Sequence, residues 1–229
     1  MTVCVIPARG GSKRIARKNL REFCGKPMLV WSIEAALESG CFAAVMLSTE
    51  DEEIAELARA HGAEVPFVRP AELADDYATT GAVMAHAVAW LAEKSREAQE
   101  ACCLYATAPF VQAQDLRDGL QRLRESQAEY VFSVTDYAFP IQRALRLQAD
   151  GSVAMFQPEQ FQTRSQDLEQ AYHDAGQFYW GKSAAWLSAK PVFESALPLI
   201  LPSHRVQDID TEEDWRRAEW LFKAMLASR

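Results

Sequence analysis

The chain has 229 residues, of which 49% are apolar and 24% charged, and this balance predicts a globular protein with a sizeable core. Its formal net charge of −8 argues against binding to nucleic acid or to an anionic membrane, and no apolar run approaches the roughly 20 residues that cross a bilayer. The apolar run at residues 3–6 is too short for a signal-peptide core. The five cysteines are odd in number and have no Cys-x-x-Cys spacing, so we expect them to be reduced thiols. We therefore expect one domain over residues 1–229, located in the cytoplasm, with no nucleic-acid or membrane partner.

The first 135 residues alternate between predicted strands and predicted helices. Short apolar runs predict strands over residues 2–6, 43–49, 64–68, 101–106 and 130–135. Apolar residues at helical spacing predict helices over 27–40, after 49, over 83–91 and around 116–123. Thr49 and Glu52 have the spacing of a capping box at the start of the second helix. This alternation produces right-handed βαβ units, so the predicted fold is a three-layer α/β/α doubly wound domain with a mostly parallel sheet.

The regular alternation stops at Asp136. Residues 136–173 are polar and rich in glutamine, and they show no helical period. Apolar residues such as Phe156 and Phe161 favour an inserted arm or lid over a disordered linker. A returning strand over 177–180, a short helix over 183–187 and an amphipathic helix over 214–225 complete the predicted elements.

A basic, glycine-containing loop directly follows the first predicted strand. It runs Ala8-Arg9-Gly10-Gly11-Ser12-Lys13, and Arg17-Lys18-Asn19 follow shortly after. Neither a Walker-type P-loop nor a Gly-x-Gly-x-x-Gly fingerprint occurs in the sequence. Paired glycines let backbone N–H groups approach phosphate oxygens, and arginine and lysine bind phosphate through charge. Because doubly wound sheets bind ligands at the carboxyl ends of their strands, the loop predicts a triphosphate site. A solvated basic loop is the alternative.

A pair of aspartates precedes the last predicted helix, in the sequence Val206-Gln207-Asp208-Ile209-Asp210-Thr211. Residues two apart in an extended segment point the same way, so Asp208 and Asp210 would present two carboxylates to one point. Mg²⁺ takes such hard oxygen ligands together with substrate phosphates and water. The alternative is that Asp210 only starts the helix, because Thr211 and Asp214 have the spacing of a capping box.

A weaker feature lies between the third predicted strand and the third predicted helix. Arg69 stands at the end of the strand, and Thr79 and Thr80 open the helix. These side chains could hold a base or a ribose, although Thr79 could equally be a helix cap.

Taken together, these segments resemble the cytidylyltransferases that activate nonulosonic, sialic-acid-like sugars as CMP-sugars. The segments "IPARGGSKRIARKNL", "GKPML", "STEDEEIAELARAHGAEVPFVRPAEL" and "QDIDTEEDW" match the landmarks of that family in order and spacing, over nearly the whole chain. The resemblance implies a nucleotide-diphospho-sugar transferase-like fold and a reaction in which CTP and an acidic nine-carbon sugar give a CMP-sugar and diphosphate. It also implies a homodimer, in which an arm at residues 136–173 exchanges between subunits.

The resemblance assigns roles to individual residues. It places Arg9 and Lys18 at the triphosphate, and Asp208 and Asp210 at a Mg²⁺ ion. The acceptor of the sugar hydroxyl proton stays open between Asp208 and a metal-bound hydroxide. The further nucleotide-binding positions that it implies are Ala8, Gly10, Gly11, Ser12, Asn19, Arg69, Thr79 and Thr80.

Two departures from the sialic-acid pattern indicate the branch of the family. The chain has "LYATAPF" where sialic-acid members carry Gln-Pro-Thr-Ser-Pro, and "YHDAGQFYWG" where they carry Asn-Gly. With "FPIQRAL", these variants look like the pseudaminic acid branch, and a sugar carboxylate suits an arginine partner. The sugar-binding residues that this branch implies are Tyr105, Phe139, Gln142, Arg143, Arg164, His173 and Gln177. The alternatives are N-acetylneuraminic acid, legionaminic acid or Kdo as the sugar, a catalytically silent CTP sensor, or a basic-loop protein that binds polyanions without nucleotide preference.

Overall fold

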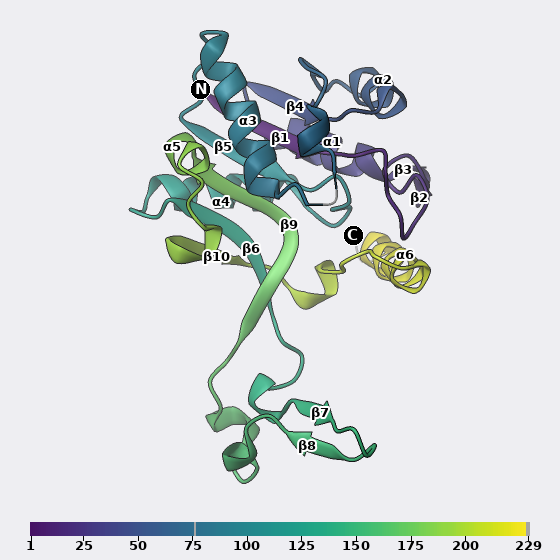
Figure 1. Cartoon of the computed structure of the whole chain (residues 1–229), viewed down its shortest axis with the longest axis vertical. Helices are drawn as coiled ribbons and strands as arrows, with labels where there is room; N and C mark the ends of the chain where they lie inside the picture. Colours follow the sequence, from purple (N-terminus) through teal and green to yellow (C-terminus); the bar gives the residue numbers. More distant parts are fainter. Residues whose placement is uncertain (76, 228–229) are drawn as a thin grey trace.

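The computed structural model describes residues 1–75 and 77–227 and centres on a six-stranded sheet in the order β10-β6-β9-β5-β1-β4 (Figure 1). The strands are β1 (Thr2–Pro7), β4 (Ala44–Ser48), β5 (Glu100–Leu104), β6 (Tyr130–Asp136), β9 (Tyr172–Lys182) and β10 (Ala196–Ile200). Strand β9 runs antiparallel to both of its neighbours, and the other pairs are parallel. The predicted mostly parallel sheet is therefore confirmed.

Helices cover both faces of this sheet. They are α1 (Met28–Ser39), α2 (Glu52–Ala60), α3 (Thr80–Glu93), α4 (Ala113–Arg124), α5 (Ser183–Leu187) and α6 (Glu212–Ala227). Apolar residues of α1, α2 and α4 form one core cluster, and those of α3 and α5 form another. In β1, Cys4 and Ile6 join the first cluster while Val3 and Val5 join the second. Successive side chains of a strand point to opposite faces, so β1 is buried on both sides and the three-layer prediction is confirmed.

Two helix starts differ in their agreement with the sequence. Helix α1 follows Pro27 and ends at Gly40, which has a φ of 66°, as the sequence predicts. The capping box predicted at Thr49 is wrong, because the cap of α2 is Asp51. Its carboxylate accepts a hydrogen bond from the Ile54 N–H at 3.1 Å. Thr49 instead accepts a hydrogen bond from the Asp51 N–H.

The strand predicted over residues 64–68 is reduced to two isolated bridges. Glu64 pairs with Met46, and Val68 pairs with Thr49. Pro66 stands between them and has no N–H to donate to a ladder, so continuous pairing stops there.

The segment predicted as an arm extends away from the sheet below β6 and β9 (Figure 1). It contains the antiparallel strands β7 (Leu145–Leu147) and β8 (Val153–Met155). Between β6 and β9 the register shifts near Ser133, and Gly176 in β9 has a φ of 62°. Such a bulge bends a strand, and β9 curves from the body of the molecule into the arm.

Short elements complete the described chain. Strands β2 (Glu22–Phe23) and β3 (Lys26–Pro27) pair with each other, and the 3₁₀ helices are η1 (Ala71–Leu73), η2 (Ile141–Arg143), η3 (Pro158–Gln160), η4 (Ser165–Asp167), η5 (Val192–Glu194) and η6 (Ser203–Arg205). Among the described residues, no helix combines the length and apolar character needed to cross a membrane.

A third apolar cluster joins α6 to the loop after β1. Phe23 contacts Trp215 and Phe222 edge to face, with ring centroids 5.4 Å apart in both pairs. Ile15 from the loop and Ile209 from the segment before α6 are both buried in this cluster. The hydrophobic effect therefore holds the basic loop against the Asp208–Asp210 segment.

Candidate active site

A cavity of about 670 Å³ opens at the carboxyl ends of β1 and β5. Its lining comes mainly from the loop after β1, the segment around Arg69 and Asp75, the start of α3, and residues 105–107. The predicted residues that line it are Arg9, Ser12, Lys18, Asn19, Arg69, Thr80 and Tyr105. The site thus lies where doubly wound sheets bind their ligands.

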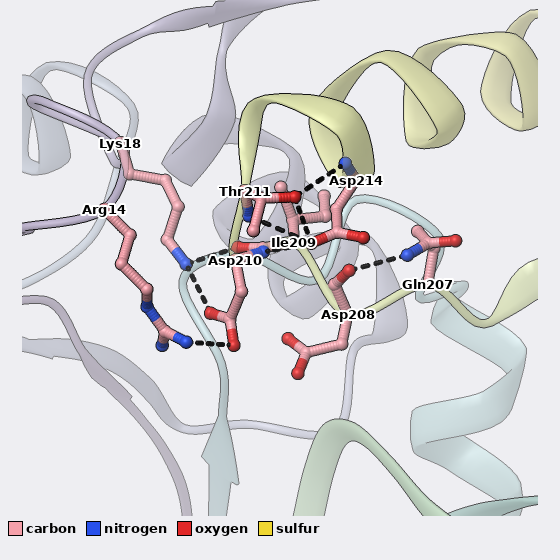
Figure 2. Close-up of polar contacts among 8 residues, drawn as sticks. All are labelled: Arg14, Lys18, Gln207, Asp208, Ile209, Asp210, Thr211 and Asp214. Carbon is pink, nitrogen blue, oxygen red and sulfur yellow. Dashed lines mark hydrogen bonds and ion pairs between the residues drawn. The ribbon is translucent and has the colours of Figure 1, made fainter. Parts of the chain in front are cut away.

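Lys18 connects the basic loop after β1 to the segment that carries Asp208 and Asp210. Its Nζ donates a hydrogen bond to the Ile209 carbonyl at 2.6 Å and lies 3.7 Å from Oδ1 of Asp210 (Figure 2). Burial lowers the pKa of Lys18, and the negative charges of Asp210 and Asp208 partly offset that effect. An ammonium group held in this way is fixed in position, and Lys18 is part of the cavity lining.

The structure tests whether Asp210 serves as a helix cap. Thr211 and Asp214 form a reciprocal cap, because the Asp214 N–H donates to the Thr211 hydroxyl at 3.2 Å and the Thr211 N–H donates to the Asp214 carboxylate at 2.9 Å. The Asp210 carboxylate instead pairs with Arg14 at 2.6 Å and with Lys18. Helix capping therefore does not account for Asp210.

The carboxylates of Asp208 and Asp210 lie on the same side of the segment (Figure 2). Burial raises the pKa of Asp208, and the negative charge of Asp210 raises it further. A divalent cation between the two carboxylates would relieve this repulsion. Within residues 1–75 and 77–227, no group of three or more His, Cys, Asp or Glu side chains is placed to hold a metal. Two carboxylates completed by substrate phosphates fit the ligand set of Mg²⁺.

The glycine loop differs from the predicted phosphate cradle. The Gly10 N–H donates to Oε1 of Glu50 at 2.7 Å. The sequence predicts this N–H as a donor to phosphate, but in this structure it donates to a carboxylate. A Cβ on Gly10 would lie within 3.0 Å of the Asp51 side chain, which explains the glycine by close packing. Open space surrounds Gly11, while Ala8 is buried in the core and donates its N–H to the Ser48 carbonyl.

Three other residues predicted to bind the nucleotide form hydrogen bonds within the protein. Asn19 is nearly buried and donates its side-chain amide to the Arg9 carbonyl at 3.0 Å, which fixes the backbone at Arg9. Arg69 is buried and donates to Ser48, so its guanidinium is held at the end of β4. Thr79 caps α3 by accepting a hydrogen bond from the Ala82 N–H, which is the structural alternative considered for it.

Three predicted sugar-binding residues lie in β9 or directly after β5. Tyr105 lines the cavity, and its hydroxyl lies 3.4 Å from that of Thr80. Gln177 is buried and donates to the Arg205 carbonyl at 2.6 Å, away from the cavity lining. His173 contacts the ring of Tyr137 at the base of the arm. Of these three, the structure brings Tyr105 to the cavity.

Comparisons with known proteins agree with this geometry. The cytidylyltransferase family model matches residues 3–192. The chain belongs to the cytidylyltransferase family. It is 46% identical over 222 residues to pseudaminic acid cytidylyltransferase of Campylobacter jejuni subsp. jejuni serotype O:2, with 96% of each chain covered. It is 30% identical to CMP-N,N'-diacetyllegionaminic acid synthase of Legionella pneumophila, again with 96% of each chain covered.

A solved structure supports the fold of this cytidylyltransferase. CMP:2-keto-3-deoxy-manno-octonic acid synthetase, solved in complex with CTP, superposes with a TM-score of 0.70. It shares 17% sequence identity, and the match covers 98% of this chain and 99% of that one. At this identity the likeness concerns the fold alone.

Four predicted sugar-binding residues of the cytidylyltransferase belong to the arm, which extends away from the sheet (Figure 1), and none of the four lines the cavity. Gln142 donates to the Glu169 carbonyl and Arg143 to the Thr163 carbonyl. Arg164 pairs with Asp167, and Phe139 is 81% exposed. Within a single chain, these four residues are engaged inside the arm or face solvent, so one chain alone does not place them at its own site.

Four residues with contacts at or near the site were not predicted from the sequence, namely Arg14, Glu50, Asp115 and Arg205. Arg205 forms a bidentate pair with Asp115 at 2.7 and 2.9 Å, and this pair joins α4 to the segment that leads into Asp208. Both side chains are nearly buried. The pair is 90 residues apart in sequence, so no local pattern signals it. Arg14 lies four residues before Lys18 in the same loop, and this spacing is the sequence signal that it neighbours the site.

Proposed function

We propose that this cytidylyltransferase transfers CMP from CTP to pseudaminic acid, giving CMP-pseudaminic acid and diphosphate. The full-length likeness to the Campylobacter pseudaminic acid cytidylyltransferase carries the proposal, because 46% identity extends over 96% of both chains. Identity to the legionaminic acid enzyme falls to 30% at the same coverage. The choice of sugar follows from this difference, and the reaction type follows from the family.

The proposed reaction is a substitution at phosphorus. The oxygen of the sugar's anomeric hydroxyl attacks the α-phosphorus of CTP and forms a new P–O bond. The bond from the α-phosphorus to the oxygen bridging to the β-phosphate breaks, and diphosphate leaves with that electron pair while the hydroxyl proton is released. Negative charge grows on the leaving group, so cations positioned in the cavity stabilise the transition state more than the ground state.

The cavity has the size and the charges for CTP. Its volume of about 670 Å³ lies within the range of roughly 300–1,000 Å³ that is typical of ligand sites. We assign Arg9 and Lys18 to the triphosphate, since both line the cavity and Lys18 is held rigidly. Ser12, Asn19 and Thr80 supply polar groups in the same cavity for the rest of the nucleotide.

Asp208 and Asp210 are the proposed ligands of Mg²⁺. The position of their two carboxylates on the same side of the segment supports this assignment (Figure 2). When bound, Mg²⁺ neutralises phosphate charge and orients the triphosphate. Lys18 then holds the segment through the Ile209 carbonyl, between the two carboxylates, so that both keep their direction.

We further propose that two chains form a homodimer through their arms. The arm exposes large apolar side chains, among them Leu147 at 77%, Phe161 at 67% and Phe156 at 61%. Contiguous exposed apolar surface is typical of an interaction site. In such a dimer the arm residues Phe139, Gln142, Arg143 and Arg164 would reach the partner's cavity, which explains why they do not reach their own.

A diphosphate-release assay with CTP and Mg²⁺ tests the proposed function. The panel contains pseudaminic acid, N-acetylneuraminic acid, an N,N'-diacetyllegionaminic acid and Kdo, and we expect the highest kcat/KM with pseudaminic acid. Higher kcat/KM with another sugar would reject the choice of sugar while keeping the reaction. CTP binding without turnover of any sugar would favour the CTP sensor instead.

A further inference from the structure

Arg14 lies in the cavity and binds one of the proposed metal ligands. Its Nη1 lies 2.6 Å from Oδ2 of Asp210, while Lys18 approaches Oδ1 of the same carboxylate at 3.7 Å (Figure 2). Arg14 is also part of the cavity lining. Its side chain is 67% exposed, so the ion pair with Asp210 is accessible to solvent and weak.

Two other arginines of the loop have different partners. Arg17 pairs with Asp51 and Glu53 at the start of α2. Arg21 pairs with Glu212 and lies over the ring of Trp215, with its guanidinium carbon 4.4 Å from the ring centroid. These contacts join the loop to α2 and α6, outside the cavity lining. Arg14 differs from both, because its partner is a carboxylate at the proposed metal site.

The charges at this site balance in the observed arrangement. In their ionised forms, Asp208 and Asp210 contribute two negative charges, and Arg14 and Lys18 contribute two positive ones. A divalent cation at the two carboxylates would supply the same positive charge and would compete with Arg14 for Oδ2 of Asp210. Lys18 is only 18% exposed and is anchored on the Ile209 carbonyl, whereas Arg14 is exposed. Arg14 is therefore the cation that can move.

We propose that Arg14 is a further substrate-binding residue, which leaves Asp210 when a divalent cation binds there and then binds the anionic substrate. The proposal rests on the proposed function for the identity of that substrate. A guanidinium binds phosphate and carboxylate oxygens alike through its fork of N–H donors. The triphosphate of CTP and the carboxylate of the sugar are thus two sources of one ligand chemistry, and the experiment below separates them.

The test compares Arg14→Ala and Arg14→Lys with Arg21→Ala, a control that removes a loop arginine paired outside the cavity. Calorimetric titration of the nucleotide-free chain with Mn²⁺, then Mg²⁺, measures competition at Asp210. Arg14→Ala removes the group that competes with the metal, so we expect the metal affinity of this variant to rise about 3- to 10-fold. The variant also loses a charged contact to the substrate, so we expect the KM of the substrate that Arg14 binds to rise about 10- to 100-fold. Arg14→Lys should lie between wild type and Arg14→Ala, and Arg21→Ala should match wild type in both measurements.

The KM values identify the anion. A rise confined to CTP assigns Arg14 to the triphosphate, and a rise confined to the sugar assigns it to the carboxylate. Unchanged metal affinity in Arg14→Ala would overturn the exchange from Asp210, and unchanged KM for both substrates would overturn substrate binding. Metal titration and calorimetric CTP binding need no sugar, so they still test Arg14 if no sugar on the panel is turned over and the proposed function fails.

Discussion

At the scale of single residues, the site depends on an aspartate and a lysine from opposite ends of the chain. The Asp210 carboxylate forms ion pairs with Arg14 and Lys18, while Thr211 and Asp214 form the cap of the neighbouring helix α6. We expect Asp210→Asn to lower kcat about 100-fold or more, because it removes one negative charge from the proposed metal site. Steady-state diphosphate release measures this, and circular dichroism checks that the fold is unchanged.

Asp214→Asn is the matched control for this prediction. It lies four residues further on and accepts hydrogen bonds from Thr211, whose hydroxyl donates at 2.8 Å. Weakening this cap should lower the free energy of unfolding by about 1 kcal/mol and change kcat little. If Asp210→Asn behaved like Asp214→Asn, with full activity and a small loss of stability, Asp210 would have no role beyond the start of α6.

At the scale of elements, an ion pair joins α4 to the segment that carries the two aspartates. Arg205 in η6 and Asp115 in α4 are 12% and 10% exposed, and Gln177 of β9 donates to the Arg205 carbonyl. Arg205→Met leaves the Asp115 carboxylate without its cation, so we expect the free energy of unfolding to fall by about 2–4 kcal/mol. Urea denaturation measures the change.

Arg217→Met provides a comparison within α6, where Arg217 pairs with Glu213 on an exposed surface. Exposed i,i+4 pairs contribute about 0.3–0.5 kcal/mol, so this variant should unfold almost as wild type does. Equal losses in the two variants would show that the Arg205–Asp115 pair contributes no more than a surface pair.

A second contact between elements predicts a dependence of stability on pH. Glu100 of β5 accepts hydrogen bonds from Arg124 of α4 and from the Thr2 hydroxyl of β1. The hydrogen bonds from Arg124, followed by the one from Thr2, lower the pKa of Glu100 below its ordinary value of 4.5, although burial opposes them.

A carboxylate whose pKa is lowered by folding contributes stability above its unfolded pKa, and this contribution is lost as the pH falls through the folded pKa. Arg124 is about half exposed, so we expect Glu100→Gln to cost about 0.5–1 kcal/mol at pH 7. The difference from wild type should shrink below about pH 4. Urea denaturation at pH 7 and pH 3.5 measures both values, and a constant difference would contradict the assignment.

At the scale of the whole molecule, the arm exposes large apolar side chains to solvent in a single chain. Leu147 and Phe156 expose most of their apolar surface. If the arm forms the proposed dimer, the double substitution Leu147→Glu and Phe156→Glu should give monomers in light scattering. It should also abolish turnover of the sugar while calorimetric CTP binding persists, because the nucleotide cavity lies in the body of each chain.

Trp220→Glu controls for the general effect of removing an exposed apolar side chain. Trp220 lies on α6 and is 69% exposed, outside the arm. This variant should remain dimeric and active. A wild-type chain that is itself monomeric and fully active would reject the proposed dimer.

Much of the fold follows from local pattern. The apolar run of β1, buried on both faces, and the Pro27 and Gly40 boundaries of α1 are read directly from the sequence. The errors occur where a local signal competes with another. Pro66 interrupts the strand expected over 64–68, and Asp51 rather than Thr49 caps α2 because Asp51 adjoins the first turn.

The sequence by itself determined the fold class and the two charged features of the site, because strand alternation, basic loop and Asp-x-Asp are local patterns. Only the tertiary structure decided how these features combine. Burial of Ile15 and Ile209 in one cluster brings Lys18 and Arg14 to Asp210, at a separation of about 190 residues. The tertiary structure also pairs the Gly10 N–H with Glu50 and directs the arm away from the sheet (Figure 1). Contacts so distant in sequence arise from the packing of whole elements, which no local pattern encodes.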